Sequence, residues 1–282
     1  MPTHLDDIRF YYDVNTADFQ RYGQGSEQAV IRRAVWGPGV AQRTAAFRYV
    51  DDLIAAELRE LHAPLRVLDF GCGLGASLLH LWEALQIQGM GFTLSPVQAQ
   101  LARQRFAAAD ATAKLSCLEA DFLSLSQEVP VADVVFAIES FVHSTSAHAF
   151  FEAAARQLKP GGTLIVCDDF LTPRAHGPLR RAEQRSIATF RHGWVAPTVI
   201  SVQEATKAAA HCGFELHTDL NLTPYLELQR PRDRALSALV YLLGPLPIPG
   251  YRWRSLVGGD ALRTALLTGL IEHRYLSWRL ST

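Results

Sequence analysis

The feature that most constrains the fold is a glycine loop that directly follows a short apolar run. Residues 65–70, LRVLDF, have the pattern of a buried strand, and GCGLG follows before an amphipathic segment begins. Glycine accepts positive φ and leaves the backbone bare, so a ligand can lie against the main chain. The helix that follows offers free N–H groups to an anion. We therefore expect a strand, a ligand-binding turn and a helix in this order.

The region from Leu65 to Leu171 repeats this unit. Short apolar runs alternate with longer amphipathic runs, which is typical of parallel βαβ units. The expected strands are LRVLDF, QGMGFTL, KLSCLEA, VADVVFAI and GTLIVCDDF, and the expected helices cover about 75–85, 96–108 and 147–158. LKPGGTL predicts a structural turn before the fifth strand. The predicted fold is α/β, a Rossmann-like doubly wound sheet that binds ligands at the carboxyl ends of its strands.

The segments outside this core suggest a cover and a lid. We expect residues 1–62 to form a mainly helical N-terminal cover, broken at WGPGV, and residues 63–171 to form the ligand-binding core. Residues 172–212 are assigned to an irregular lid and a return helix that Gly213 ends. Residues 213–282 are expected to complete the sheet and the substrate pocket, with a proline-rich loop, a helix around Asp260 to Ile271 and a final strand in RYLSWRL.

Composition excludes several classes of function. With 27 Lys and Arg against 28 Asp and Glu, the formal charge of -1 gives no field that would attract nucleic acid. The four cysteines lie far apart and without metal-ligand spacing, as free thiols do, which favours a reducing cytoplasmic setting. The N-terminus has no signal-peptide pattern, and no apolar run is long enough for a membrane span. We expect a soluble protein without a metal site of its own.

Side chains at three strand ends indicate which ligand the glycine loop binds. Dinucleotide-binding proteins use a similar loop but carry an acid at the end of the second strand, where this chain has Thr93. Asp69 directly precedes the glycines, where its carboxylate can accept from the ammonium group of a methionine. Asp121 and Phe122 follow the third strand and suit the amine and the ring of adenine. The combination favours S-adenosylmethionine, although a helix N-cap is a competing interpretation of Asp121.

The run GFTLSPVQ (91–98) resembles the second motif of methyltransferases that act on carbon atoms of lipids, namely the sterol, tocopherol, cyclopropane-fatty-acid and prenyl types. The resemblance covers about residues 8–171 and a lid-type helix from Gly193 to Gly213, and extends to bacterial natural-product enzymes that methylate terpenoids. It implies S-adenosylmethionine as donor and S-adenosylhomocysteine as product. The donor-binding residues that it implies, together with the residues above, are Asp69, Gly71, Gly73, Gly75, Thr93, Leu94, Gln98, Asp121 and Phe122.

Local structure gives a second account of part of this motif. Ser95 suits a helix N-cap, Pro96 the first helical position, and Gln98 the return bond of a capping box. In the resembling group, the equivalents of Thr93 and Gln98 contact the donor's ribose hydroxyls. Both accounts can hold for Gln98, but local structure alone does not explain Thr93.

The candidate catalytic residues follow the fourth strand, in AIESFVHST (137–145). A charged residue is unusual at the end of such an apolar strand. In the resembling prenyl and lipid enzymes, a glutamate here is the base or the electrostatic partner of a cation, and the resemblance assigns this role to Glu139. His143 lies about one helical turn further along and is the candidate for an assisting residue. A surface or capping histidine is the competing interpretation.

Aromatic residues are expected on the acceptor side, because a carbocation is stabilised by aromatic faces in a dry pocket. Tyr12, Phe141 and Trp194 are the candidates for substrate contacts. Residues 10–25, FYYDVNTADFQRYGQG, are similar to the segment that covers the donor in sterol and prenyl methyltransferases. After Gly25 the chain departs from the sterol pattern, which disfavours a sterol as substrate.

Arginines form the last candidate feature. The basic residues of this set are Arg32, Arg33, Arg174, Arg180, Arg181, Arg185, Arg191 and those of RPRDR (230–234). Guanidinium groups suit a diphosphate head group, but a solvated lid surface explains the same pattern. Magnesium is expected only if the acceptor is a diphosphate, since no acidic DDxxD-type cluster is present.

The leading hypothesis is C-methylation of an isoprenoid alkene, either a prenyl diphosphate or a prenylated secondary metabolite, with cyclisation left open. The alternatives are O- or N-methylation of a small apolar natural product, with His143 as base, and a catalytically silent donor-binding protein. The apolar C-terminal region is also suited to a homo-oligomer interface.

Overall fold

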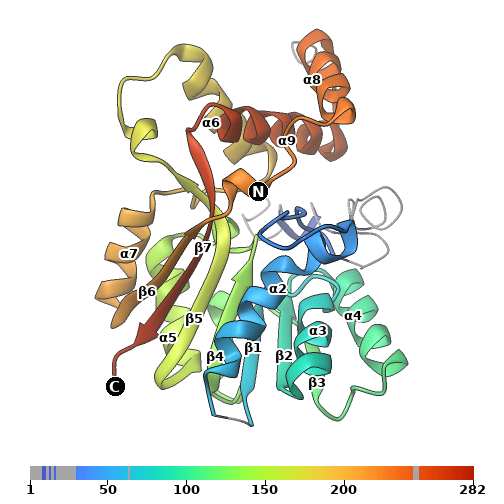
Figure 1. Cartoon of the computed structure of the whole chain (residues 1–282), viewed down its shortest axis with the longest axis vertical. Coiled ribbons are helices and arrows are strands. Elements are labelled where there is room, and N and C mark those ends of the chain that lie inside the picture. The colour runs from blue at the N-terminus through green and yellow to red at the C-terminus, as the bar shows by residue number, and fades with distance from the viewer. Residues whose placement is uncertain (1–7, 11–12, 14–15, 17–29, 63, 244–247) are drawn as a thin grey trace.

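The computed structural model describes residues 8–10, 13, 16, 30–62, 64–243 and 248–282. A sheet lies at the centre of this part of the chain, with the strand order β3-β2-β1-β4-β5-β7-β6 (Figure 1). The strands are β1 (Arg66–Phe70), β2 (Gln88–Thr93), β3 (Leu115–Glu119), β4 (Ala132–Ile138), β5 (Leu158–Leu171), β6 (Phe214–Asn221) and β7 (Ile271–Leu280).

Strand pairing explains where a ligand can bind. The first five strands are parallel to their neighbours, whereas β7 is antiparallel to both β5 and β6. β1 lies between β2 on one side and β4 on the other, so the chain order reverses there. The carboxyl ends of β1, β2 and β4 consequently meet at one switch point, which is the usual ligand site of an open α/β sheet.

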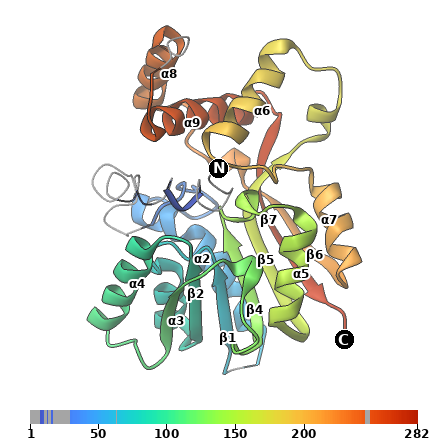
Figure 2. The same cartoon turned by 180° about the vertical axis from the view of Figure 1, so that it is seen from behind.

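Helices cover both faces of the sheet. Apolar side chains of α2 (Arg43–Arg59), α3 (Ala76–Leu85) and α4 (Pro96–Ala108) form one core with inward residues of β1, β4 and β5. On the opposite face, α5 (Ala147–Gln157) and α7 (Val202–His211) form the second core (Figure 2). Phe150 and Phe151 of α5 are fully buried in it. The two cores enclose the sheet from both faces and so fix the positions of its strand ends.

A helical lid lies beyond the carboxyl ends of the parallel strands (Figures 1 and 2). It contains α6 (Arg181–Gly193), α8 (Pro231–Leu243) and α9 (Tyr251–Leu267). α6 and α9 pack closely, because Gly193 and Gly258 have no side chains at their crossing. A separate apolar cluster, which includes Phe190 and Leu262, holds the lid together.

The observed elements agree with most of the predicted ones. The α/β class, the five core strands and their helices, the return helix and the final strand are all present. The helix predicted around Asp260 to Ile271 was wrong at both ends, since α9 begins at Tyr251 and ends at Leu267. The predicted turn at Gly161 lies inside β5, where the β4 register shifts between Ala132 and Val134.

Two helices were not predicted from the sequence. α6 lies in the segment expected to be irregular, and α8 lies where only a basic run was noted. In α6 the Arg180 N–H donates to the carboxylate of Glu183, which satisfies one free backbone donor at the helix start. The arginine-rich composition concealed this helix. Its apolar residues pack in the apolar cluster of the lid and not in the main core.

Candidate active site

A pocket opens at the switch point of the sheet. It is lined by the loop after β1, the end of β2, the turn after β3 and the segment after β4. The lining residues are Ile8, Ile31, Gly71, Gly73, Thr93, Leu94, Gln98, Asp121, Phe122, Leu123, Ile138, Glu139, Ser140, His143 and Ser144. A smaller cavity next to it shares Ile31, Gly71, Gly73 and Ile138, and adds Arg32, Asp69 and Ser77. We call the two together the donor pocket.

The glycine loop leaves bare backbone at the pocket wall. Gly71 has φ +96°, and a Cβ there would lie 2.4 Å from the Cβ of Ser140. Gly73 has φ +52° and open space where a Cβ would stand. Gly75 does not line the pocket; it begins α3 with φ +73°, and a Cβ there would lie 2.6 Å from the Phe106 ring. Gly75 therefore serves the packing of α3 against α4.

Asp69 is a buried carboxylate at the end of β1. Its side chain makes no hydrogen bond to another described residue, although only 3% of the residue is exposed. Burial raises the pKa of Asp69 well above its ordinary value, and the negative charge of Asp51 raises it further. A cation that enters this cavity would favour the ionised form. The donor set thus fits an ammonium group such as that of S-adenosylmethionine.

Thr93 and Gln98 lie together on the β2 side of the pocket. Thr93 Oγ1 donates to Gln98 Oε1 at 2.8 Å, and Gln98 Nε2 donates to Thr16 Oγ1 at 3.1 Å. The predicted Ser95 cap is confirmed, because its hydroxyl accepts from Gln98 N at 3.2 Å. The return bond predicted for Gln98 was wrong, since the Ser95 N–H donates to Thr93 Oγ1. The Gln98 side chain is instead directed to the pocket and the cover.

The turn after β3 supplies an acid and an aromatic ring. Asp121 Oδ1 accepts from Leu123 N at 2.9 Å, so the N-cap interpretation is confirmed for this oxygen. Oδ2 has no hydrogen bond to a described residue, and Asp121 still lines the pocket. The Phe122 ring stacks on Phe70 at 5.1 Å and lines the same wall. Asp121 and Phe122 therefore both line the pocket, and their contact with an adenine stays a prediction.

Described residues of the N-terminal cover contact this side of the pocket. Ile8 lines it, and Arg9 forms an ion pair of 2.8 Å with Glu119 at the end of β3. Asp13 accepts a hydrogen bond from the Ser95 hydroxyl. The N-terminal segment thus crosses the ends of β2 and β3, as a cover over the pocket must.

Glu139 projects from a strained position directly after β4. Its φ is +51°, a conformation that costs a non-glycine residue roughly 1–2 kcal/mol. The backbone is held there because Glu139 N donates to Cys167 O at 2.8 Å. Its Oε1 accepts from the backbone N of Arg33 at 3.1 Å and from the guanidinium Nε at 3.2 Å. Oε2 makes no hydrogen bond to a described residue, and Glu139 lines the donor pocket.

A buried charge network stands behind Glu139. Arg33 Nη2 donates to Asp169 Oδ2 at 2.8 Å and lies 3.2 Å from His273 Nδ1. Asp169 Oδ1 is 3.1 Å from the same His273 nitrogen. Burial alone would raise the pKa of Asp169, but Arg33 and His273 outweigh it and lower that pKa below its ordinary value. Asp169 and His273 are almost fully buried, so this network fixes Arg33, and Arg33 fixes Glu139.

Arg32 faces the opposite way, into the smaller cavity. It forms an ion pair with the buried Asp51 and donates to Ser77 Oγ at 3.0 Å and Phe47 O at 2.8 Å. Ser77 lies in the first turn of α3, whose N–H groups face the same cavity. The cavity therefore holds a cation and a helix N-terminus on one side and Asp69 on the other, which suits the carboxylate and ammonium of an amino acid.

His143 stands between the donor pocket and the lid. It is the last residue of the 3-10 helix Phe141–His143, is 8% exposed, and its Nδ1 lies 3.0 Å from Val195 O. A carbonyl oxygen only accepts, so Nδ1 carries the hydrogen, and a neutral His143 has its acceptor at Nε2. Val195 has φ +53°, an outlier for a β-branched residue. Two strained residues, Glu139 and Val195, thus flank His143.

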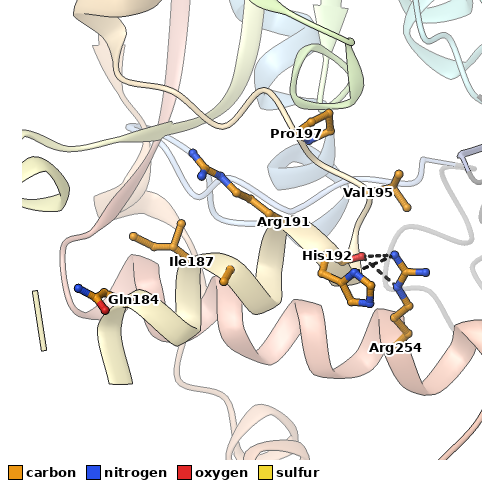
Figure 3. Close-up of a pocket in the computed structure, with 8 residues that line it drawn as sticks. Gln184, Ile187, Arg191, His192, Val195, Pro197 and Arg254 are labelled. Atoms are coloured by element: carbon orange, nitrogen blue, oxygen red, sulfur yellow. Dashed lines mark hydrogen bonds between the residues drawn. The ribbon is translucent and has the colours of Figure 1, made fainter. Parts of the chain in front are cut away.

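The other side of Val195 faces a groove of about 570 Å³ under the lid (Figure 3). Its lining combines apolar and basic side chains. The residues are Gln184, Ile187, Ala188, Arg191, His192, Val195, Pro197 and Arg254. Arg254 donates to the carbonyl of His192 at 2.6 Å, and Arg191 to that of Val199 at 2.6 Å. The hydrogen bond between His143 and Val195 O joins the wall of this groove to the wall of the donor pocket.

The predicted basic cluster does not gather at one place. Arg174 and Arg180 both form ion pairs of 2.7 Å with Glu183, and Arg32 and Arg33 are buried with the acids described above. Arg191 lines the groove. Among the described residues, no group of three or more His, Cys, Asp or Glu side chains is placed to hold a metal ion. No helix of this part of the chain is long and apolar enough to cross a membrane.

The predicted substrate aromatics are not brought together. Tyr12 lies outside the described residues. The prediction for Phe141 was wrong, because its ring is fully buried between Phe150 and Phe170, at 5.0 and 5.6 Å, and does not line the pocket. Trp194 Nε1 donates to Ser255 O at 3.1 Å, so this ring fastens α6 to α9 beside the groove and does not line it.

Ile31, Arg32, Arg33 and Ser77 are among the residues that the sequence interpretation did not assign to the donor pocket. The two arginines were assigned to a basic cluster that suited either a diphosphate or a solvated surface. The signal that could have identified them is their place inside an apolar run, AVIRRAVW, where exposed arginines are not expected.

Residues 67–162 match a family of proteins described as the methyltransferase domain. A sterol 24-C-methyltransferase of Debaryomyces hansenii is 28% identical over 213 residues, which cover 75% of this chain and 54% of that protein. The chain thus spans about half the length of this relative. A 27-O-demethylrifamycin SV methyltransferase of Amycolatopsis mediterranei is 28% identical over 195 residues, 69% of this chain and 70% of that protein.

The fold is shared over the whole chain with a solved methyltransferase. A geranyl diphosphate methyltransferase in complex with geranyl diphosphate and sinefungin superposes with a TM-score of 0.77 at 17% identity, covering 98% of this chain and 99% of that one. The predicted fold, an α/β sheet of the class I methyltransferase type, is confirmed. The helical cover predicted for residues 1–62 lies partly outside the described residues and stays a prediction. The resemblance to the sterol and prenyl group of S-adenosylmethionine-dependent methyltransferases is likewise supported.

Proposed function

We propose that this chain is an S-adenosylmethionine-dependent C-methyltransferase that methylates an alkene carbon of an isoprenoid. In this proposal the acceptor is a prenyl diphosphate or a prenylated secondary metabolite, and Glu139 removes a proton from the carbocation that forms. The family match, the sterol 24-C-methyltransferase relative and the shared fold support the methyltransferase activity.

The observation that carries the proposal is the position of Glu139. Its carboxylate lines the donor pocket, is anchored to Arg33 through one oxygen, and has no hydrogen bond to a described residue at the other. An O- or N-methyltransferase needs a base for a polar proton but no fixed anion beside the methyl acceptor. A carbocation needs both a nearby negative charge and a base, and a positioned carboxylate supplies the two together.

The donor half of the proposal assigns one role to each side of the donor pocket. S-adenosylmethionine supplies an electrophilic methyl group when bound. Asp69 would accept from its ammonium group, Arg32 and the start of α3 would face its carboxylate, and Asp121 and Phe122 would contact its adenine. Thr93 and Gln98, already joined by a hydrogen bond, would receive the ribose hydroxyls.

The acceptor half uses the groove under the lid. The apolar side chains of its lining, Ile187, Ala188 and Val195, suit a hydrocarbon chain, and Arg191 and Arg254 suit an anionic or polar group. In the proposed reaction the alkene π electrons would form a C–C bond to the methyl carbon as its bond to the sulfonium sulfur breaks, which leaves S-adenosylhomocysteine. The cation would then lose a neighbouring proton to Glu139 Oε2. Glu139 returns the proton to water when the product leaves. Ring closure before this proton loss would give a cyclised product.

A labelled methyl donor tests this proposal. The full-length chain is incubated with methyl-labelled S-adenosylmethionine and a panel of prenyl diphosphates, prenylated alkaloids and a sterol, and the label is located by NMR. We expect the label on carbon of a prenyl chain. Label on oxygen or nitrogen of the acceptor would contradict C-methylation. Turnover of the sterol alone would keep C-methylation and replace the acceptor class.

A second candidate is O-methylation of a small apolar natural product, and two observations favour it. Val195 O holds His143 with its acceptor nitrogen at Nε2, as a general base requires. The relative named for O-demethylrifamycin methylation covers 69% of this chain. A His143→Gln variant separates the two candidates, because an O-methyltransferase would lose turnover while a Glu139-dependent reaction would retain most of it.

A further inference from the structure

Helix α8 has an apolar face that nothing in the described structure covers. α8 extends from the far end of α9, away from the sheet (Figures 1 and 2). Ala235, Ala238, Leu239 and Leu242 have the i, i+3, i+4, i+7 spacing of one helix face, and all four are exposed. Leu239 is 41% exposed and Leu242 70%, and the neighbouring Tyr241 is 83% exposed. We call these five residues the apolar row.

The opposite face of α8 is already occupied. Leu236, Val240 and Leu243 are half-buried, and the Ser237 hydroxyl donates to the Asp260 carboxylate of α9. α8 is therefore apolar on two sides, of which only one is used. A helix that is apolar all round is normally buried, and an exposed apolar patch on a soluble domain usually marks an interaction surface.

The charges around the apolar row identify the partner. Arg232 and Arg234 are exposed and, at 100° per residue, lie at its two margins. The one acid of α8, Asp233, is buried and paired with Arg230. Residues 235–259 contain no Asp or Glu and add Arg252, Trp253 and Arg254. This local excess of arginine contrasts with a whole-chain formal charge of -1.

We propose that α8 binds the surface of an anionic lipid bilayer, with the apolar row in the acyl boundary and its arginines at the phosphates. Arginine side chains extend their apolar stems along such a surface and leave the guanidinium in the headgroup layer. A second copy of this chain would bring no acidic side chain to meet Arg232 and Arg234 along this segment. Anionic phospholipids supply that charge, which favours the bilayer over self-association.

The proposal has a consequence for substrate access. Phe10 of the N-terminal cover is 50% exposed, and its ring lies 4.8 Å from that of Tyr251 at the start of α9. The membrane-facing lid thus contacts the segment that crosses the donor pocket. An apolar acceptor could pass from the bilayer toward the groove without crossing water. Lipid binding goes beyond the proposed methyl transfer and can be measured without any acceptor.

Vesicle flotation tests the proposal with the full-length chain. We expect it to float with phosphatidylcholine vesicles that contain phosphatidylglycerol, to bind pure phosphatidylcholine more weakly, and to be released by salt. Replacement of Arg232 and Arg234 by Gln should lower the partition coefficient on anionic vesicles roughly tenfold. Failure of the wild-type chain to float with either vesicle would overturn the proposal.

A matched pair of variants separates the apolar row from general surface hydrophobicity. Leu239→Ser with Leu242→Ser should lower the partition coefficient at least about tenfold. Leu118→Ser with Leu220→Ser removes two leucines that are 42% and 41% exposed on β3 and β6, and should leave it unchanged. An equal loss in both pairs would contradict the proposal. If the Leu239→Ser, Leu242→Ser pair lowers the midpoint of thermal unfolding, the single Leu242→Ser variant is used in its place. Leu242 is the most exposed leucine of the apolar row.

Light scattering decides between the bilayer and a second copy. We expect the oligomeric state of the wild-type chain to be the same as that of the Leu239→Ser, Leu242→Ser variant. A wild-type oligomer that this variant dissociates would show that another copy covers the apolar row, and would overturn the lipid proposal.

Discussion

The donor side and the acceptor side of the cleft are built in different ways. On the donor side, each polar group lies within a few residues of a strand end: Asp69 ends β1, Thr93 ends β2 and Asp121 follows β3. On the acceptor side, Glu139 depends on Arg33, which depends on Asp169 and His273. The residues Arg33 and His273 are separated by 240 positions in the chain. One side is local in sequence, and the other is assembled by the fold.

This difference has a physical origin. The carboxyl ends of parallel strands lie at one edge of the sheet, so the sheet alone brings together the residues that follow these strands. A buried carboxylate at the acceptor edge needs a cation, and none is available from its own strand. The cation comes from the segment that precedes α2, and a strand added antiparallel at the far side, β7, supplies His273 to orient it. The acceptor side therefore depends on long-range contacts, which a few substitutions can disconnect.

The largest expected effect is that of Glu139→Gln. The amide keeps the shape of the side chain and its hydrogen bond from Arg33 but removes the charge and the proton acceptor. We expect turnover to fall roughly 10²-fold or more, with unchanged donor affinity by calorimetry. The control is Glu215→Gln, an exposed carboxylate on β6. Unchanged turnover in Glu139→Gln would show that Glu139 is not the base. The donor side would then be the only side of the cleft that acts in the reaction.

Arg33→Lys tests the acceptor side at the residue that holds Glu139. Lysine keeps the charge near Asp169 but cannot reach two carboxylates with a planar fork. We expect kcat to fall roughly tenfold to thirtyfold while the donor KM changes little.

The control for Arg33→Lys is the double variant with Glu139→Gln. If Arg33 acts only by positioning Glu139, the double variant is no slower than Glu139→Gln alone. Independent, multiplying losses would contradict a positioning role.

The same network predicts a dependence of stability on pH. Because the folded pKa of Asp169 is below its unfolded value, this carboxylate stabilises the fold above the unfolded pKa, and the contribution is lost as the pH falls through the folded value. In Arg33→Gln that pKa should rise, so the midpoint of acid unfolding should move to higher pH. Acid titrations followed by circular dichroism measure it; an unmoved midpoint would contradict the assignment of the shift to Arg33.

What the sequence could predict follows the same division. Asp69, Gly71 and Gly73 lie in one contiguous strand–loop pattern, and Thr93 ends the next strand, so the order of strands and loops predicted their meeting at the sheet edge. Glu139 was identified because a charge at the end of an apolar strand is out of place. Its partner Arg33 was not identified. The apolar run around Arg33 indicates burial, but nothing local shows which carboxylate a buried arginine reaches.

The aromatic residues show the limit of local reasoning most clearly. Phe141 directly follows the Glu139–Ser140 turn, which suggested the cleft, yet its ring is directed into the core of α5. The direction of a side chain after an irregular turn depends on the backbone dihedrals in that turn. The positive φ of Glu139 cannot be read from the sequence, so the direction of Phe141 could not be predicted.

Asp69→Asn tests the donor side and should have a smaller effect. An amide accepts a hydrogen bond from an ammonium group without neutralising it. We expect the dissociation constant of S-adenosylhomocysteine to rise about tenfold. Asp52→Asn, on the exposed side of α2, is the matched control. Equal affinity in wild type and Asp69→Asn would mean that the buried carboxylate is protonated and serves the fold instead of the donor.

The smallest effect is expected at the lid, in Trp194→Phe. Phenylalanine keeps an aromatic ring against Gly258 and Gly259 but loses the indole N–H that donates to Ser255 O. One such hydrogen bond contributes about 1 kcal/mol, so thermal or urea unfolding should show a loss of about that size. Turnover and the acceptor KM should stay within about twofold, because the ring joins α6 to α9 and does not line the groove. A large rise in acceptor KM without loss of stability would instead place Trp194 against the substrate, and the acceptor side would then extend further into the lid than the groove beside Val195.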